Sequence, residues 1–153
     1  MILAAEGEFR LDAEADTARL GAAIGRELKA HEAVCLSGPL GAGKSVLARG
    51  LIRALAGDET EVPSPTFTLV QTYEGAAFAV AHFDLYRLAS ADEAFELGFD
   101  EALDAGAAVV EWPEKLGHHL PADRLDVALA FDGDGRRARL TPHGSWEERP
   151  LEF

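Results

Sequence analysis

One glycine-rich stretch has the residue types and spacing of a phosphate-binding loop. Residues 38–45 read Gly-Pro-Leu-Gly-Ala-Gly-Lys-Ser, which fits the pattern G-x-x-x-x-G-K-[ST]. Glycines at these places allow successive backbone N–H groups to curl around phosphate oxygens, because a Cβ atom would block the turn. The pattern predicts that Lys44 contacts the β- and γ-phosphates of a nucleoside triphosphate and that Ser45 binds Mg²⁺.

Two acidic residues follow apolar stretches further along the chain. Asp84 comes after residues 78–83, and Glu111 comes directly after residues 107–110. A carboxylate at the carboxyl end of a buried strand lies where α/β sheets bind their ligands. We predict Asp84 to be a Walker-B-type Mg²⁺ carboxylate and Glu111 to bind Mg²⁺ or orient the attacking water. The alternatives are a cap or turn residue for Asp84 and a solvated loop residue for Glu111.

Three further residues are weaker candidates. Thr66 follows Ser64-Pro65, and its hydroxyl could sense a γ-phosphate from a loop that the prolines pre-set; a plain proline turn is the alternative. Trp112 could form a wall of the nucleotide site or simply pack in the core. His82 precedes Phe83-Asp84, and we expect it to be a structural histidine within a strand.

The elements that must position these residues follow from hydrophobic periodicity and turn signals. Helices are predicted over 12–30 (with Asp12 as the cap), 44–56 and 91–97, and strands over 33–36, 67–73, 77–83, 107–110, 125–131 and 136–140. Strands alternating with helices indicate an α/β fold, and the hairpins make the sheet mixed. We predict a P-loop NTPase-like three-layer sandwich with hairpin additions in a single domain, residues 1–153, with 142–153 as a loose tail.

Charge and composition restrict the function further. The net charge is −13 and the chain has only three lysines, so autonomous nucleic-acid binding is not expected. An acidic surface suits either solubility or docking to a basic protein partner. The chain contains no Asn, which excludes the Asn-Lys-x-Asp guanine-recognition motif of typical GTPases. No apolar run is long enough to span a bilayer, and residues 1–6 lack the basic start of a signal peptide, so we expect no membrane association and a cytoplasmic protein.

Five segments in order jointly resemble one family across about residues 10–130. They are Leu40-Gly-Ala-Gly-Lys-Ser45 with Arg49-Gly50, Val62-Pro-Ser-Pro-Thr-Phe-Thr-Leu-Val70, His82-Phe-Asp-Leu-Tyr-Arg-Leu88, Glu96-Leu-Gly-Phe-Asp100 and Val109-Val-Glu-Trp-Pro-Glu114. The combination is similar to TsaE (YjeE), the bacterial ATPase of tRNA threonylcarbamoyladenosine (t6A) biosynthesis. One departure is Val46, because many members carry a second threonine there.

The resemblance implies a set of roles and partners. The nucleotide, ATP or ADP, would be bound by Leu40, Gly41, Ala42, Gly43, Lys44, Ser45, Val46 and Trp112. Mg²⁺ would be bound by Ser45, Glu111 and Asp84. Asp84 and Glu111 would take part in hydrolysis, and Thr66 would belong to the nucleotide-sensing switch. The partners would be the TsaD and TsaB transferase subunits, which hold the tRNA, so that tRNA contact is only indirect. The ATPase would be weak alone and stimulated by these partners. A small P-loop metabolite or nucleoside kinase and a non-catalytic nucleotide sensor are the alternatives.

Overall fold

A computed structural model of the chain describes residues 2–4, 6–65 and 69–153. The strands are β1 (Ile2–Ala4), β2 (Gly7–Leu11), β3 (Ala33–Ser37), β4 (Val70–Glu74), β5 (Ala79–Asp84), β6 (Gly106–Glu111), β7 (Arg124–Asp132), β8 (Gly135–His143) and β9 (Pro150–Glu152). The α-helices are α1 (Glu14–Glu27), α2 (Lys44–Ala56), α3 (Ala91–Glu96) and α4 (Phe99–Ala105), and two 3₁₀ segments are η1 (Pro113–His119) and η2 (Gly144–Trp146).

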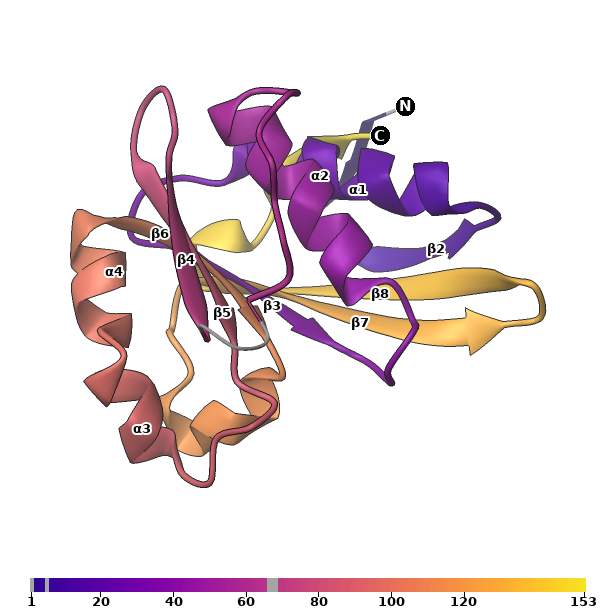
Figure 1. Cartoon of the computed structure of the whole chain (residues 1–153). Coiled ribbons are helices and arrows are strands. Elements are labelled where there is room, and N and C mark those ends of the chain that lie inside the picture. Colours follow the sequence, from indigo (N-terminus) through magenta and orange to yellow (C-terminus); the bar gives the residue numbers. More distant parts are fainter. Residues whose placement is uncertain (1, 5, 66–68) are drawn as a thin grey trace.

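A mixed central sheet organises the molecule (Figure 1). Its seven strands run in the order β2-β8-β7-β3-β6-β5-β4. The pairs β3–β6, β3–β7 and β5–β6 are parallel, while β2–β8, β7–β8 and β4–β5 are antiparallel. The parallel centre places the carboxyl ends of β3, β6 and β5 side by side, which is where an α/β sheet gathers its ligand-binding residues.

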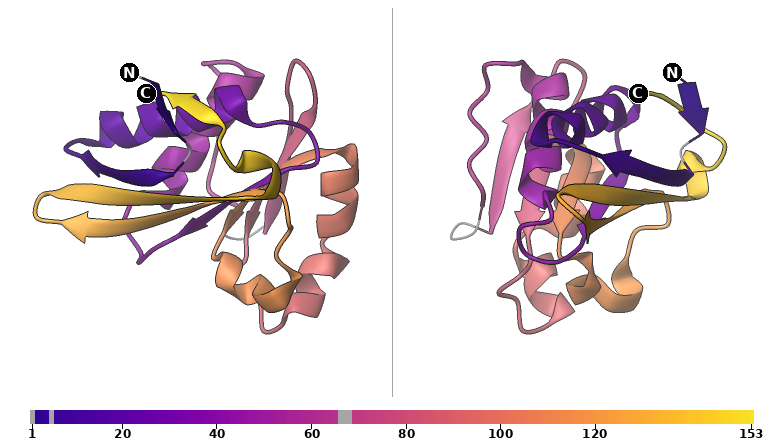
Figure 2. Two further views of the ribbon diagram at one scale, coloured as in Figure 1. Left: turned by 180° about the vertical axis from the view of Figure 1, so that it is seen from behind. Right: turned by 90° about the vertical axis from the view of Figure 1, so that its right-hand side faces the viewer.

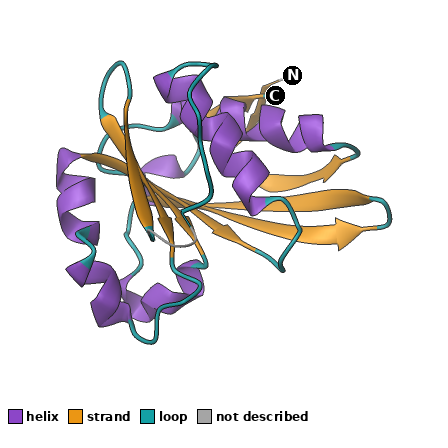
Figure 3. Ribbon diagram, viewed as in Figure 1, coloured by secondary structure: helices purple, strands orange, loops and turns teal. Residues whose placement is uncertain are grey.

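Helices cover both faces of the sheet (Figure 3). The side chains of each central strand therefore point alternately into two cores. On β3, Val34 and Leu36 face the core formed with α1 and α2, whereas Ala33 and Cys35 face the core on the side of α3, α4 and η1. Burial on both faces explains why the central strands read as continuous apolar runs. The predicted α/β sandwich with a mixed sheet is confirmed. None of the helices in the described part of the chain is long and apolar enough to cross a membrane.

The prediction of a loose tail over 142–153 is wrong. β9 pairs with β1 in a small antiparallel sheet that brings the two ends of the chain together (Figure 2). Trp146 is 0% exposed and Leu151 is 1% exposed, and both belong to the core next to α1 and α2. These apolar residues help to fix the segment, because a buried Trp contributes a large apolar surface.

An ion pair reinforces the packing of this C-terminal segment. Arg149 donates to both carboxylate oxygens of Glu32 at 2.7 and 2.6 Å, and the Ser145 hydroxyl donates to the same carboxylate at 2.6 Å. The guanidinium also lies over the Trp146 ring at 4.3 Å. Burial alone would raise the pKa of Glu32, but the hydrogen bonds from Arg149 and Ser145 outweigh it, and the pKa is lowered.

Local boundaries also differ from prediction at α1. The helix begins at Glu14 rather than at residue 12, and its N-cap is Ala13, whose backbone N–H donates to Asp16 at 3.0 Å. Asp12 is therefore not the cap.

Strands β1 and β2 and helix α4 were not predicted, because each is short and gains its stability from packing or pairing with distant residues. The predicted strand over 67–73 begins only at Val70, and residues 66–68 lie outside the described residues.

Substituting Glu32→Gln is expected to lower the free energy of unfolding by about 3 kcal/mol at neutral pH, because Arg149 stays buried without its counter-charge. Since folding lowers the pKa of Glu32, its contribution is complete above the ordinary value of 4.5 and is lost as the pH falls through the lower folded value. Urea unfolding of both proteins across pH 3–7 measures this. The exposed Glu8, 3.4 Å from Arg139, provides the control: Glu8→Gln should change stability by less than about 1 kcal/mol.

Candidate nucleotide-binding site

The glycine-rich loop leaves the end of β3 and leads directly into α2. Gly38, Gly41 and Gly43 have φ values of 137°, 84° and 109°, which side chains with a Cβ rarely adopt. At Gly38 an added Cβ would lie 2.4 Å from the Leu129 carbonyl oxygen on β7. The loop thus needs glycine both for its backbone angles and for its close approach to the sheet, and it directs the amino end of α2 toward the pocket.

Lys44 is held against this loop. Its Nζ donates to the carbonyl oxygens of Gly38 at 2.5 Å and Pro39 at 3.0 Å, and it lies 4.2 Å from the centre of the Trp112 ring. Burial lowers the pKa of Lys44, against the opposing charges of Glu111, Glu114 and Asp84. Trp112 itself adopts a left-handed backbone (φ 61°), an uncommon conformation for a bulky residue that tends to occur at functional sites.

Glu111 lies at the carboxyl end of β6, with both carboxylate oxygens engaged. The Ser45 hydroxyl donates to Oε1 at 3.3 Å, and His82 Nε2 lies 2.6 Å from Oε2. Because a carboxylate only accepts hydrogen bonds when charged, we assign the proton to His82 Nε2. Glu111 is therefore a buried acid that joins the glycine-rich loop to β5, and it is not a solvated loop residue.

Asp84 lies beside Glu111, because the two residues are register partners at the ends of the parallel strands β5 and β6. Its Oδ1 accepts the backbone N–H of Tyr86 at 3.1 Å. Burial raises the pKa of Asp84, and the neighbouring Glu111 charge adds to the effect. Two carboxylates and a hydroxyl at one sheet edge form an oxygen donor set of the kind that Mg²⁺ prefers.

A pocket of about 270 Å³ brings the predicted residues together. Its lining consists of Leu40, Gly41, Gly43, Lys44, Ser45, Val46, Ser64, Asp84, Glu111 and Trp112. Ala42 is fully buried and lines an adjoining pocket instead. Thr66 lies outside the described residues, although Ser64 from the same loop reaches the lining.

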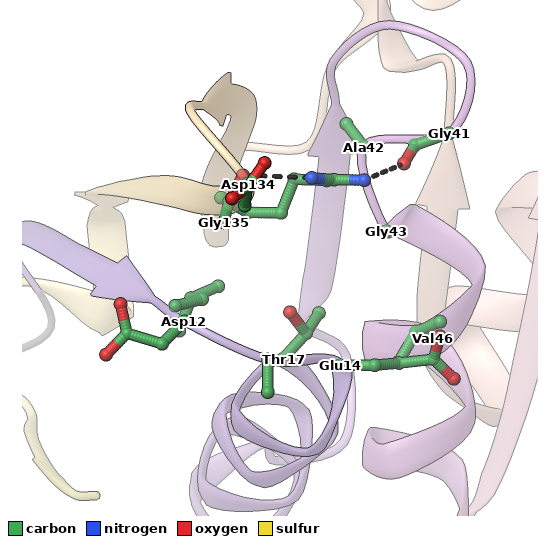
Figure 4. Close-up of a pocket in the computed structure, with 12 residues that line it drawn as sticks. Asp12, Glu14, Thr17, Gly41, Ala42, Gly43, Val46, Asp134 and Gly135 are labelled. Atoms are coloured by element: carbon green, nitrogen blue, oxygen red, sulfur yellow. Dashed lines mark hydrogen bonds between the residues drawn. The ribbon is translucent and has the colours of Figure 1, made fainter.

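The adjoining pocket, of about 150 Å³, was not predicted (Figure 4). Asp12 and Thr17 line one side of it, Gly41 and Gly43 another, and the turn between β7 and β8 closes it with Asp134 and neighbouring residues. Arg136, near the start of β8, donates to the Gly41 carbonyl oxygen at 3.1 Å. The only sequence signal for it was the cluster of arginines at 136, 137 and 139. The pocket continues along the glycine-rich loop, since Gly41, Gly43 and Val46 line both cavities.

A strand–glycine loop–helix unit beside parallel strands that end in acids places the chain among proteins with a P-loop NTPase-like fold. Residues 11–139 match the model of the family described as threonylcarbamoyl adenosine biosynthesis protein TsaE. The chain belongs to this family.

Individual relatives agree with this assignment. The chain is 41% identical over 147 residues to a "tRNA threonylcarbamoyladenosine biosynthesis protein TsaE" of Rickettsia conorii, covering 94% of this chain and 84% of the relative. Proteins with the same name from Treponema pallidum (40% identity, 80% of this chain and 90% of the relative) and Mycobacterium tuberculosis (44%, 74% and 73%) are also similar. The crystal structure of Bacillus subtilis YdiB superposes with a TM-score of 0.77 at 26% identity, over 97% of this chain and 91% of YdiB.

Proposed function

We propose that this chain is a Mg²⁺-dependent ATPase that supports t6A formation in tRNA. Membership of the TsaE family, and the biosynthetic role that its relatives' names state, support the pathway. The observation that carries the ATPase is the convergence of Lys44, Ser45, Asp84 and Glu111 on one pocket beside the glycine-rich loop. A phosphate-binding loop, a lysine and acids for the metal are the parts that P-loop hydrolases use.

The residues around the pocket divide the work of hydrolysis. Backbone N–H groups of the loop and the amino end of α2 would bind the phosphate oxygens. Lys44 would exchange the Gly38 and Pro39 carbonyl oxygens for the β- and γ-phosphates, which are stronger, charged acceptors. Ser45, Glu111 and Asp84 would hold Mg²⁺, which neutralises charge on the transferring phosphoryl group.

We expect the nucleoside to bind in the adjoining pocket. That cavity shares Gly41, Gly43 and Val46 with the pocket of the acids, so a nucleotide with its phosphates in the loop would extend into it. Asp12 and Thr17 supply acceptors and a hydroxyl there. We expect these side chains to contact the ribose or the base.

Hydrolysis by the chain alone should be slow. None of the described residues that line the pocket of Lys44 and Glu111 is an arginine, and an arginine finger contributes about 10³–10⁵ to the rate where one is present. A partner protein would supply such a group. We infer that the transferase subunits TsaD and TsaB are these partners and that tRNA is bound through them.

Exposed apolar side chains suggest where the partner docks. In the described part of the chain the exposed large hydrophobic residues are Leu40, Tyr86 and Phe131. Leu40 lies in the glycine-rich loop, and Tyr86 packs on Trp112, with ring centres 4.9 Å apart. Phe131 stacks with Arg136, which bonds to Gly41. All three therefore border the nucleotide site, so a partner that covers them would respond to the bound nucleotide.

Reconstitution tests the proposed function directly. Purified chain, ATP and Mg²⁺ are added to TsaD, TsaB, unmodified tRNA and the threonylcarbamoyl donor, and modified adenosine is measured over several turnovers. The expected result is that turnover continues only with this chain and ATP, with ATP hydrolysis stimulated by the subunits. No dependence on the chain would contradict the pathway, and robust transfer of phosphate from ATP to a metabolite would favour a kinase.

Substituting Phe131→Ser is expected to weaken nucleotide-dependent binding to the transferase subunits by about 30-fold, because a central aromatic contact is worth about 2 kcal/mol. Phe131 is 53% exposed, so the fold should tolerate the change. Surface plasmon resonance with ADP, ATP or no nucleotide measures the affinity. Ala130→Ser, one residue earlier on the opposite face of β7, serves as the control and should bind normally. Equal affinity of both variants would move the docking surface elsewhere.

A further inference from the structure

His82 has a closer relation to the candidate site than its sequence context indicated. It lies on β5, with its side chain 1% exposed, two residues before Asp84. Its Nε2 is 2.6 Å from Oε2 of Glu111, whose side chain is 4% exposed. Hydrogen bonds to an ionised acceptor are short and about twice as strong as neutral ones. The contact is therefore a strong, water-shielded link between two strands.

The two oxygens of the Glu111 carboxylate have different partners. Oε2 accepts from His82, and Oε1 accepts from the Ser45 hydroxyl at 3.3 Å. The terminal torsion of a glutamate has broad, two-fold preferences, so the carboxylate alone would not hold one plane. With Oε2 bonded to His82, Oε1 stays directed at Ser45, which is the residue at the candidate Mg²⁺ position.

Packing alone does not account for a histidine here. His82 Nδ1 is buried and has no hydrogen-bond partner among the described residues. An unpaired buried polar atom costs free energy, about 1–3 kcal/mol in the general case. A phenylalanine would fill a similar volume on this face of β5 without that cost. The bond to Glu111 is the contact that only the histidine provides.

We propose that His82 is a positioning residue for the metal site. Its Nε2–H fixes the plane of the Glu111 carboxylate so that one oxygen faces Ser45 and the pocket. His82 does not line that pocket and contacts no reacting group in this arrangement. The inference rests on the proposed function, since it assigns Glu111 to Mg²⁺. Outer partners that orient a metal ligand contribute about 10–100-fold to metal affinity.

Two substitutions separate the hydrogen bond from the volume of the ring. His82→Phe removes the donor and keeps a planar side chain, whereas His82→Gln can present an amide N–H close to the position of Nε2. Mn²⁺ binding in the presence of ADP, followed by electron paramagnetic resonance, reports metal affinity without catalysis. We expect about 10–100-fold weaker Mn²⁺ binding in His82→Phe, substantial recovery in His82→Gln, and ADP affinity in EDTA unchanged in both. The Mg²⁺ concentration for half-maximal hydrolysis should rise in parallel.

Each outcome decides the matter. Normal Mn²⁺ affinity in folded His82→Phe would overturn the positioning role while leaving the ATPase intact, and equal losses in both variants would assign His82 to packing alone. If wild-type protein with ADP bound no Mn²⁺, the proposed function and the positioning role would fall together. Should His82→Phe not fold, His82→Gln alone resolves the question: Mn²⁺ affinity close to that of the wild type supports the positioning role, and a loss of about 10–100-fold in folded His82→Gln would overturn it.

Discussion

Substituting Lys44→Ala is expected to weaken ATP binding at least about 100-fold and to remove hydrolysis with it. Hydrogen bonds to charged groups contribute about 1.5–3 kcal/mol each, and Lys44 is expected to contact two phosphates. The gain is a net one, because Lys44 must first leave the carbonyl oxygens of Gly38 and Pro39. The positive charge of Lys44 also offsets the negative charges of Glu111 and Asp84, which would otherwise repel phosphate.

Titration with a fluorescent ADP or ATP analogue measures this loss. Lys29→Ala is the matched control, since it causes the same change in net charge at an exposed position outside both pockets. It should bind nucleotide as the wild type does. Binding by Lys44→Ala within a few-fold of the control would contradict the assignment of the glycine-rich loop to phosphate. Thermal unfolding of both variants shows whether any loss follows from misfolding.

The parts of the fold that the sequence predicted are those with local signals. The glycine-rich loop is recognisable because its spacing and its backbone angles are properties of eight consecutive residues. Helix α2 was predicted with its observed bounds, Lys44–Ala56, because the loop defines its start and Gly57 its end. Asp84 and Glu111 stood out because each ends an apolar run, and two buried strands in a parallel sheet end at the same edge.

The contacts missed from the sequence join residues far apart in the chain. Arg149 pairs with Glu32, 117 residues away, and that distance hides the anchoring of the C-terminal segment. The pocket next to the loop needs Asp12 and the turn at Asp134 to meet, and neither has a local pattern that indicates binding. The bond between His82 and Glu111 depends on how β5 and β6 align. A one-residue shift would direct His82 to the opposite face of the sheet.

Glu111→Ala is expected to lower the rate of ATP hydrolysis at least about 100-fold while nucleotide binding is retained. A positioned acid–base group contributes about 10²–10⁴ to a rate, and a lost Mg²⁺ ligand adds to the effect. The loop N–H groups and Lys44 remain in place to hold the phosphates. Because a negative charge is removed beside them, ADP binding in EDTA should be unchanged or tighter, whereas the Mg²⁺ requirement should increase.

Two comparisons separate the carboxylate's charge from its place in the fold. Glu59→Ala removes the same charge from an exposed residue outside both pockets and should leave hydrolysis within a few-fold of normal. Glu111→Gln keeps an oxygen for the hydrogen bond from His82 but loses the charge that would bind Mg²⁺. Loss of hydrolysis in both Glu111 variants would assign the role to the charge. Loss in Glu111→Ala alone would mean that the carboxylate is needed mainly to keep β5, β6 and the loop together, and normal hydrolysis in both would remove Glu111 from the mechanism.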